Sequence, residues 1–436
     1  MSEEKNVNDL ERKEEKKKRL DCFVIAKNLS KLYRFLTFSD TSRVFVYDEG
    51  VYKETGEEFI MKLLEKELGH KLTTYYVNEI INHIKRMSLI NRGKIIEAST
   101  NLLCLENGIL DMDKLIMMSH NPDLVFFNKL PVVYNHQVDC KKFKKFLFEV
   151  CSLVDAKKIQ HYIGYCLIRR NLYQKALMLY GPGGGGKSTF LETMRRFFGI
   201  ENCKSILLQD IEENRFTRIE LFGKLANIAP DIPAKALHTS SRFKAIVAGD
   251  GISGEKKGKD PFEFIPYCKL MFSANQIPET MDFSEAFFRR WILAEFPQNF
   301  EDSAECIPNL RDDFITSNEM SGILNWALEG KKEVDMFQFA DVLDTKIKWL
   351  RSSNSVYGFC QDILMEGSKE EWIVREELFK KYLRYCKSWG LKGVSENLFY
   401  RRIRNNYEIE VFHPSVGEEE KKQVEAWKGI KWKRNI

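Results

Sequence analysis

The chain has 436 residues, of which 44% are hydrophobic and 30% charged, so it can form packed cores and is not a wholly disordered protein. Its 68 Lys and Arg residues against 63 Asp and Glu leave a net charge of only +5, which excludes a protein that coats nucleic acid through bulk positive charge. We expect no membrane span, because no apolar run approaches roughly 18 residues, and no zinc ribbon, because none of the 10 Cys forms a CxxC pair. The charged N-terminus is no signal peptide, so we expect reduced thiols and a cytoplasmic location.

Before residue 175 the pattern predicts a tail and two regions. Residues 1–20 alternate acidic and basic side chains and predict a solvated, charged tail. Residues 21–140 predict an N-terminal α/β domain, with helices at 58–68 and 76–87 and short strands at 43–47, 102–105, 124–127 and 130–134. Residues 141–174 predict a helical collar, because apolar side chains recur at helical spacing in one run from 140 to 173.

From residue 175 onward the pattern predicts three more regions. Dense alternation of strand and helix over 175–300 is typical of an α/β core, and residues 301–352 predict a helical extension. Residues 353–436 predict a winged-helix-like domain, with helices at 372–389 and 395–405 and a hairpin from 407–413 and 424–432. The arginines at 401, 402 and 404 leave this domain open to two interpretations, DNA binding and protein docking.

The strongest motif is a glycine-rich loop that matches GxxxxGK[ST] in full. A buried-strand pattern at 176–180 precedes it and an amphipathic helix pattern follows it, as phosphate-binding loops require. Glycines let backbone N–H groups turn inward toward phosphate oxygens, a lysine reaches the β- and γ-phosphates, and a hydroxyl reaches Mg²⁺. The predicted ATP-binding residues are Gly181, Pro182, Gly183, Gly184, Gly185, Gly186, Lys187, Ser188 and Thr189.

Two later strands end in polar side chains that could complete the site. The apolar run from 225 ends at Asp231, which we predict to support Mg²⁺ as a Walker B acid, although an ordinary turn residue is the alternative. The run 269–274 ends at Asn275, which could orient the attacking water or sense the γ-phosphate. Because Pro230 precedes Asp231, no paired acid is present, and the base that activates water stays open between Asp231, Asp210 and Glu212.

Two basic elements complete the pattern. Arg289 and Arg290 precede a predicted strand at 292–296, where an arginine could reach the ATP of a neighbouring subunit. A Gly- and Lys-rich segment between strand-like flanks predicts an exposed hairpin that contacts a phosphodiester backbone, with a solvated loop as the alternative. The lysines of this segment are Lys244, Lys256, Lys257 and Lys259.

In this order the elements resemble those of a superfamily 3 helicase, and more closely the phage/plasmid and poxvirus-type primase–helicase family. The matching segments are 181–189, 225–231, 244–259, 270–278 and 286–291, with further likeness at 107–111, 130–134, 163–166 and 378–400. The resemblance covers residues 20–436 and is most specific over 175–300. It implies an α/β fold: a P-loop, AAA+-like motor with a mixed α/β N-terminal domain and a C-terminal winged-helix-like domain.

The resemblance also implies roles for single residues. Lys187, Ser188 and Asp231 would hold ATP and Mg²⁺, and Asn275 would be the sensor. Arg290, or less readily Arg289, would be an arginine finger acting in trans. The lysines of the predicted hairpin would track DNA.

The resemblance further implies a DNA helicase that hydrolyses ATP. Such motors form rings, usually hexamers, around single-stranded DNA and unwind forked duplexes, typically 3′ to 5′. The setting would be replication of a virus, plasmid or integrated element in the cytoplasm of a prokaryotic or archaeal host, with a primase or polymerase as partner.

Two departures from the family pattern keep other interpretations open. Gly185 stands where the family commonly has Asn, and only about 20 charged residues precede the shared region, so we expect a stand-alone helicase or helicase fragment without a primase domain. An ATP-dependent DNA-binding initiator or loader that does not unwind is the main alternative. A small-molecule P-loop kinase would explain the glycine-rich loop but not the later elements.

Overall fold

The computed structural model describes residues 20–39, 41–91, 100–233, 236–255, 262–300, 310–314, 316–334, 342–368, 370–388, 391, 393–416 and 422–433. The chain divides into two compact units, residues 1–131 and 132–436. Within the described ranges, no helix is both long and apolar enough to cross a membrane. The nine cysteines there are all free, and all but Cys22 are buried.

The first unit combines helices with two small sheets. Its helices are α2 (Cys22–Leu32), α3 (Gly56–Leu68) and α4 (Thr74–Met87). One sheet has the order β3-β2-β1-β4, built from Val51–Lys53, Val44–Asp48, Phe35–Phe38 and Leu89–Ile90; the other is the antiparallel β5-β6-β7, from Leu102–Leu105, Gly108–Asp111 and Ile116–Met118. The predicted strands at 124–127 and 130–134 are wrong, because that stretch is irregular and pairs only through a single bridge between Leu105 and Leu130.

The second unit is centred on a five-stranded sheet in which every strand is parallel to its neighbours. The order is β14-β8-β13-β10-β9, and the strands span Trp291–Glu295, Ala176–Tyr180, Lys269–Ala274, Ala226–Ala229 and Cys203–Lys204. β8, β10 and β13 are buried along their whole length, as expected of a parallel sheet covered on both faces. Since the strands are parallel, the loops that follow them all emerge at one edge of the sheet.

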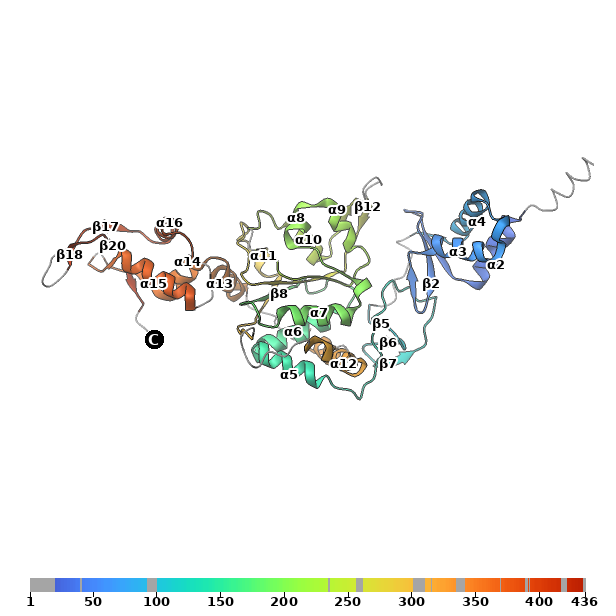
Figure 1. Ribbon diagram of the computed structural model, residues 1–436, viewed down its shortest axis with the longest axis horizontal. Helices are drawn as coiled ribbons and strands as arrows, with labels where there is room; N and C mark the ends of the chain where they lie inside the picture. The colour runs from blue at the N-terminus through green and yellow to red at the C-terminus, as the bar shows by residue number, and fades with distance from the viewer. Residues whose placement is uncertain are drawn as a thin grey trace, which may run out of the picture. The chain divides into compact units, whose positions relative to one another are not determined.

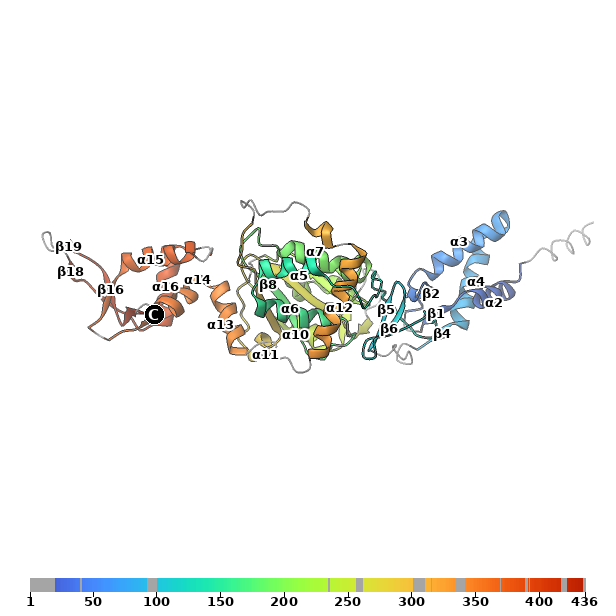
Figure 2. The ribbon, with the colours of Figure 1, turned by 90° about the horizontal axis from the view of Figure 1, so that it is seen from below.

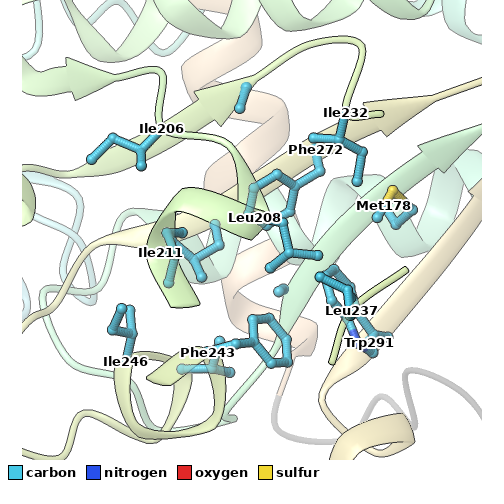
Figure 3. Close-up of a cluster of buried hydrophobic side chains, with 14 of the residues drawn as sticks. Met178, Ile206, Leu208, Ile211, Ile232, Leu237, Phe243, Ile246, Phe272 and Trp291 are labelled. Atoms are coloured by element: carbon cyan, nitrogen blue, oxygen red, sulfur yellow. The ribbon is translucent and has the colours of Figure 1, made fainter. Parts of the chain in front are cut away.

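Helices cover both faces of this sheet. Figure 1 shows α7 (Lys187–Phe198) and α6 (Leu153–Cys166) on one face, with α8 (Leu208–Glu213) and α10 (Ser241–Ala248) on the other. The core between the sheet and the α8/α10 layer includes Met178, Phe272 and Trp291 from the strands and Leu208 and Phe243 from the covering segments (Figure 3). Phe243 stacks on Trp291 with ring centroids 4.4 Å apart, which fixes α10 against the sheet.

The helical collar differs from the single predicted run. It consists of two helices, α5 (Lys141–Val150) and α6 (Leu153–Cys166), because Ser152 caps the second helix by accepting a hydrogen bond from the Asp155 backbone N–H. A long helix, α12 (Ser317–Glu333), packs on α6. A Cβ at Gly164 would lie 2.3 Å from the Lys331 backbone nitrogen, so glycine is needed for the two helices to approach this closely.

The segment predicted as a lysine-rich hairpin contains a helix at its start. Residues 241–248 form α10, so the predicted strand-like flank beginning at Phe243 is wrong and Lys244 lies on a helix. β11 (Ile252–Gly254) and β12 (Phe262–Phe264) then pair antiparallel as the two arms of a hairpin. Lys256, Lys257 and Lys259, at the predicted tip, lie outside the described residues. Short helices α9 (Arg215–Arg218) and α11 (Glu285–Phe288) complete the region.

The C-terminal part of the second unit has a core of its own. Its helices are α13 (Val342–Ser353), α14 (Ser355–Ile363), α15 (Arg375–Ser388) and α16 (Glu396–Asn406). Its strands are β15 (Leu364–Glu366), β16 (Trp372–Val374), β17 (Glu410–Phe412), β18 (Ser415–Val416), β19 (Lys422–Gln423), β20 (Ala426–Lys428) and β21 (Ile430–Trp432). The two predicted helices correspond to α15 and α16, and β17 pairs with β20 as the predicted hairpin, although 372–374 is a strand, not helix.

Candidate phosphate-binding site

The glycine-rich loop lies at the carboxyl edge of the parallel sheet. β8 ends at Tyr180 and α7 begins at Lys187, so residues 181–186 connect a buried strand to a helix N-terminus. Gly181 has φ = +144°, and a Cβ there would lie 2.1 Å from the Phe296 carbonyl oxygen. This position therefore requires glycine for both its backbone conformation and its packing. A helix N-terminus that follows such a loop presents backbone N–H groups to an anion.

The structure explains why glycine stands at position 185. A Cβ at Gly185 would lie 2.7 Å from the Gln298 carbonyl oxygen and 3.2 Å from that of Phe296. The segment after β14 lies against the loop, since the Phe296 N–H donates to the Tyr180 carbonyl and the Phe300 N–H to the Gly184 carbonyl. The departure from the family pattern at Gly185 is thus accommodated by close backbone packing.

Lys187 is buried within the loop, with only 4% of its surface exposed. Its ammonium donates to the carbonyl oxygens of Gly181 at 2.9 Å and Pro182 at 2.6 Å. Burial lowers the pKa of Lys187, and the carboxylate of Asp231 opposes that shift. The ammonium and the carboxylate therefore lie within electrostatic range of each other.

Asp231 and Asn275 lie at the same edge of the sheet as the loop. The Asp231 N–H donates to the Ser273 hydroxyl at 3.1 Å, which ties the residue after β10 to the neighbouring strand β13. Asp231 has φ = +52°, an unusual conformation for a residue with a side chain, and its carboxyl group is exposed. Asn275 directly follows Ala274, which pairs with Tyr180, the residue that precedes the glycine-rich loop. The glycine-rich loop, Asp231 and Asn275 therefore meet at one edge of the sheet.

A small cavity of about 310 Å³ adjoins the start of α7. It is lined by Ser188, Thr189, Leu191, Glu192, Arg195, Ser205, Ile228 and Pro230. The exposed hydroxyl of Ser188 and the exposed carboxylate of Asp231 supply oxygen donors of the kind that Mg²⁺ prefers. The residues present thus fit a magnesium ion that also binds phosphates.

Arg289 and Arg290 lie at the opposite, amino edge of the sheet. They directly precede β14, and the Ala176 N–H at the start of β8 donates to the Arg290 carbonyl oxygen. Burial, together with both arginines, lowers the pKa of Lys175 to about 8, so three cations are concentrated here. The five residues of β8 separate this edge from the glycine-rich loop by about 16 Å at roughly 3.3 Å per residue.

The two arginines differ in accessibility. Arg289 is exposed, whereas Arg290 is only 8% exposed and donates to the Ala286 carbonyl oxygen at 2.5 Å. Burial and the neighbouring Arg289 lower the pKa of Arg290. These environments favour Arg289 as the side chain that can reach outward, which is the reverse of the order predicted from the sequence.

Lys244 and Glu212 have local partners of their own. Lys244 forms an ion pair with Asp282 at 2.8 Å, and this bond helps to lower the Asp282 pKa although burial alone would raise it. The Glu212 carboxylate accepts hydrogen bonds from the backbone N–H groups of Arg242 and Phe243, so it caps the N-terminus of α10. Glu212 is thereby engaged in structure, which disfavours it as the base that activates water.

Sequence reasoning missed two buried polar residues that hold the sheet. Lys269, at the start of β13, is 2% exposed and donates to the carbonyl oxygens of Ile168, Arg170 and Tyr267 at 2.9–3.1 Å. Burial lowers its pKa to about 8. Asn227, inside β10, exchanges two hydrogen bonds with the backbone of Ile206. A lysine and an asparagine inside apolar runs were the available signals, because buried polar groups require partners.

Segments of the chain match three family models. Residues 8–152 match a model described as "D5 N terminal like", and residues 351–432 match "Poxvirus D5 protein-like". Together these two matches flank the glycine-rich loop. They support a D5-like affiliation. Residues 179–290, which include the loop, match a family of unknown function, DUF5906.

Solved structures of low sequence identity also align with this chain. The apo structure of the NrS-1 C-terminal region (305–718) aligns over 94% of this chain and 99% of that one, with 13% identity and a TM-score of 0.47. An A-form apo structure of the same region aligns over the same shares, with 12% identity and a TM-score of 0.46. At this identity, residue roles must be argued from the chain's own geometry.

Proposed function

We propose that this protein is an ATP-dependent DNA helicase of superfamily 3 that acts in the replication of a virus, plasmid or integrated element. The observation that carries the proposal is the convergence of Lys187, Asp231 and Asn275 on one edge of a parallel sheet, next to a glycine-rich loop and a helix N-terminus. The D5-like affiliation supports a replication role. The central domain would then be an AAA+-like motor and the C-terminal one winged-helix-like.

The residues of the loop would bind the triphosphate of ATP. Lys187 now donates to two carbonyl oxygens of its own loop, so its ammonium can exchange these neutral acceptors for β- and γ-phosphate oxygens without refolding. Charge that develops on the γ-phosphate during hydrolysis strengthens that bond, which is how a positioned cation accelerates the reaction. Asn275 would hold the attacking water, and Asp231 is the candidate to accept its proton.

Ser188 and Asp231 would hold Mg²⁺, which when bound neutralises phosphate charge. Both side chains are exposed toward solvent at the carboxyl edge. Ser188 lies at the start of α7, which follows β8, and Asp231 lies after the end of β10. The two residues are far apart in the sequence but close in the sheet, since only β13 lies between β8 and β10.

The arginines would complete the site of a neighbouring subunit. Because Arg289 and Arg290 lie at the edge opposite their own glycine-rich loop, neither can reach ATP bound in the same chain. Lys175 and Arg290, whose pKa values are lowered by burial and by the neighbouring positive charge, gain most from an anion brought by another molecule. We therefore propose a ring, as a hexamer, in which each subunit's Arg289 or Arg290 reaches its neighbour's γ-phosphate.

The β11/β12 hairpin would contact single-stranded DNA in the ring. Its arms pair at Ile252–Phe264 and Gly254–Phe262, and the segment between them carries Lys256, Lys257 and Lys259 in the sequence. Removing two of these lysines should weaken DNA binding and reduce its salt dependence while leaving basal ATP hydrolysis unchanged.

Unwinding of a forked DNA duplex tests the proposal against its main alternative. Strand separation that requires ATP and disappears in Lys187→Ala would support a helicase. ATP hydrolysis without strand separation would favour an initiator or loader, an outcome consistent with the missing acid at Pro230. Transfer of phosphate to a small molecule would instead identify a kinase. A primase or polymerase partner can be sought by adding it to the same assay.

A further inference from the structure

Two adjoining grooves lie on the C-terminal part of the chain and share one side chain, Trp432. The first, of about 870 Å³, is lined by the basic face of α15 with Arg351, Asp362, Ile363, Glu377, Lys380, Lys381, Arg384, Tyr385, Ser388 and Trp432. The second, of about 740 Å³, is lined by Met365, Glu370, Glu371, Trp372, Ile373, Lys431, Trp432 and Lys433. β16 and α15, which contribute to the two grooves, follow one another directly in the chain, and both are labelled in Figure 2.

The first groove is lined by more Lys and Arg side chains than Asp and Glu side chains. Asp362 is already paired with Arg351 at 2.8 Å and accepts a hydrogen bond from the Tyr385 hydroxyl at 2.7 Å. Lys381 is held over the Trp432 ring, 4.1 Å from its centroid, rather than by an acid. Among the residues that the structure describes, no carboxylate forms an ion pair with Arg384. Lys381 and Arg384 therefore remain available to an external anion.

Aromatic surface lies beside these cations. Trp372, on β16, is 40% exposed, an unusual state for a large apolar ring, and it lines the second groove together with Trp432. Cations beside exposed aromatic faces match single-stranded nucleic acid, whose phosphates pair with cations while unpaired bases stack on rings. A duplex keeps its bases stacked inside and cannot use the rings in this way.

The helix α16, whose arginines suggested DNA binding from the sequence, is less available to an external ligand. On α16, Arg402 donates to Glu279 at 3.0 Å and to Asn354 at 3.1 Å, and Arg404 lies 5.1 Å from the centroid of Trp427. Two of its three arginines therefore already have partners within the chain. The third, Arg401, is exposed and does not line either groove.

We infer that Lys381, Arg384, Trp432 and Trp372 form a track that binds single-stranded nucleic acid. This site is separate from the β11/β12 hairpin and rests on the proposed function only for the nature of its ligand. It would hold the strand outside the motor, independently of the ATP state.

Binding of fluorescein-labelled oligonucleotides to the full chain, measured by anisotropy without ATP, tests the track. The probes are single strands of about 20 nucleotides, one of deoxythymidine and one of uridine, and a duplex of equal length. For Lys381→Ala with Arg384→Ala we expect weaker binding of the single strands. The slope of log K against log salt should fall by about 1.4, since each contact with a single strand contributes about 0.7. Trp372→Ala should weaken binding at least about fivefold with the slope unchanged.

Two matched variants serve as controls. Lys62→Ala with Lys66→Ala removes the same charge from the exposed surface of α3 and should leave affinity and slope unchanged. Lys381→Arg with Arg384→Lys keeps both cations and should retain binding, which excludes misfolding as the cause of a loss.

The uridine and thymidine arms show whether RNA, DNA or both are bound, and either supports the track. Unchanged affinity and slope in Lys381→Ala with Arg384→Ala would overturn it. So would a loss confined to the duplex. The binding assay contains no ATP, so a negative result would not count against the proposed ATP-driven motor. Loss of ATP hydrolysis would likewise not change the interpretation of the binding result.

Discussion

Arg402 of α16 donates a hydrogen bond to the carboxylate of Glu279 at 3.0 Å. Glu279 lies four residues after Asn275, in the loop that follows β13. The same loop is held at two more points: the Trp349 indole N–H donates to the Pro278 carbonyl at 3.1 Å, and Gln276 donates to the Ser353 carbonyl at 3.4 Å. The loop that follows β13 is therefore anchored to α13 and α16, outside the sheet. A movement of Asn275 would therefore also displace these helices.

The Arg402–Glu279 contact should be measurable as a coupling. Because both side chains are partly exposed, we expect Arg402→Ala to lower the free energy of unfolding by about 1 kcal/mol and Glu279→Gln by less. Because each single variant already removes the contact, the double variant should cost less than the sum of the two single variants. Thermal unfolding of the four proteins measures this, and strict additivity would contradict the contact.

Gly185 should not tolerate a side chain. Since a Cβ there would meet the Gln298 carbonyl oxygen at 2.7 Å, Gly185→Ala should cost about 1–3 kcal/mol and weaken ATP binding by displacing the segment after β14. Gly251→Ala is the matched control, because its Cβ would meet no atom within 4 Å. Thermal unfolding and binding of a fluorescent ATP analogue check both; equal behaviour of the two variants would show that the packing is unimportant.

Mixing of inactive subunits should restore ATP hydrolysis if the arginine acts in trans. Asp231→Ala removes the acid of a subunit's own site, whereas Arg289→Ala removes only the group offered to its neighbour. In an equal mixture about a quarter of the interfaces combine an intact acid with an intact arginine, so turnover should return to about that fraction. A mixture that assembles but stays inactive would argue against a finger at Arg289 and direct the test to Arg290→Ala.

Lys269 should make stability depend on pH in the alkaline range. Its pKa is lowered to about 8 in the folded chain but would be near 10.5 when unfolded, so between these values the unfolded chain binds more protons. Stability from this group therefore rises with pH from about 8 to 10.5, by at most about 1.4 kcal/mol per pH unit.

Comparison with Lys269→Met isolates that dependence. The variant leaves three carbonyl oxygens without a donor and should cost about 3 kcal/mol at neutral pH. The difference in melting temperature between wild type and variant should widen in favour of wild type above pH 8. Parallel pH curves for the two proteins would contradict the assignment, since all other lysines are common to both.

The strands of the central sheet could be predicted from the sequence because they are short apolar runs that end in polar or glycine residues. Residues 176–180 and 269–274 are buried over their full length, as their composition indicated. The same rule failed at 243–248, where a short apolar run is a helix, since such runs do not distinguish a buried strand from a buried helix. It also failed at 124–127, which packs apolar side chains without pairing as a strand.

The arrangement of the candidate site depended on topology that the sequence does not state. That Asp231 comes near Lys187 follows from the order β8-β13-β10, and that Arg289 is far from both follows from the direction of β14. The cap at Glu212 depends on a contact between residues about 30 positions apart. Local patterns identified the residue types, whereas distances between them required the folded chain.

ATP hydrolysis by the full chain, with and without single-stranded DNA, tests the central claim most directly. We predict turnover that DNA stimulates in wild type and that falls at least about 100-fold in Lys187→Ala, because the variant loses the cation that stabilises the transition state. Lys204→Ala, at a partly exposed lysine paired with Glu220, should match wild type. Equal turnover in wild type and Lys187→Ala would contradict the account.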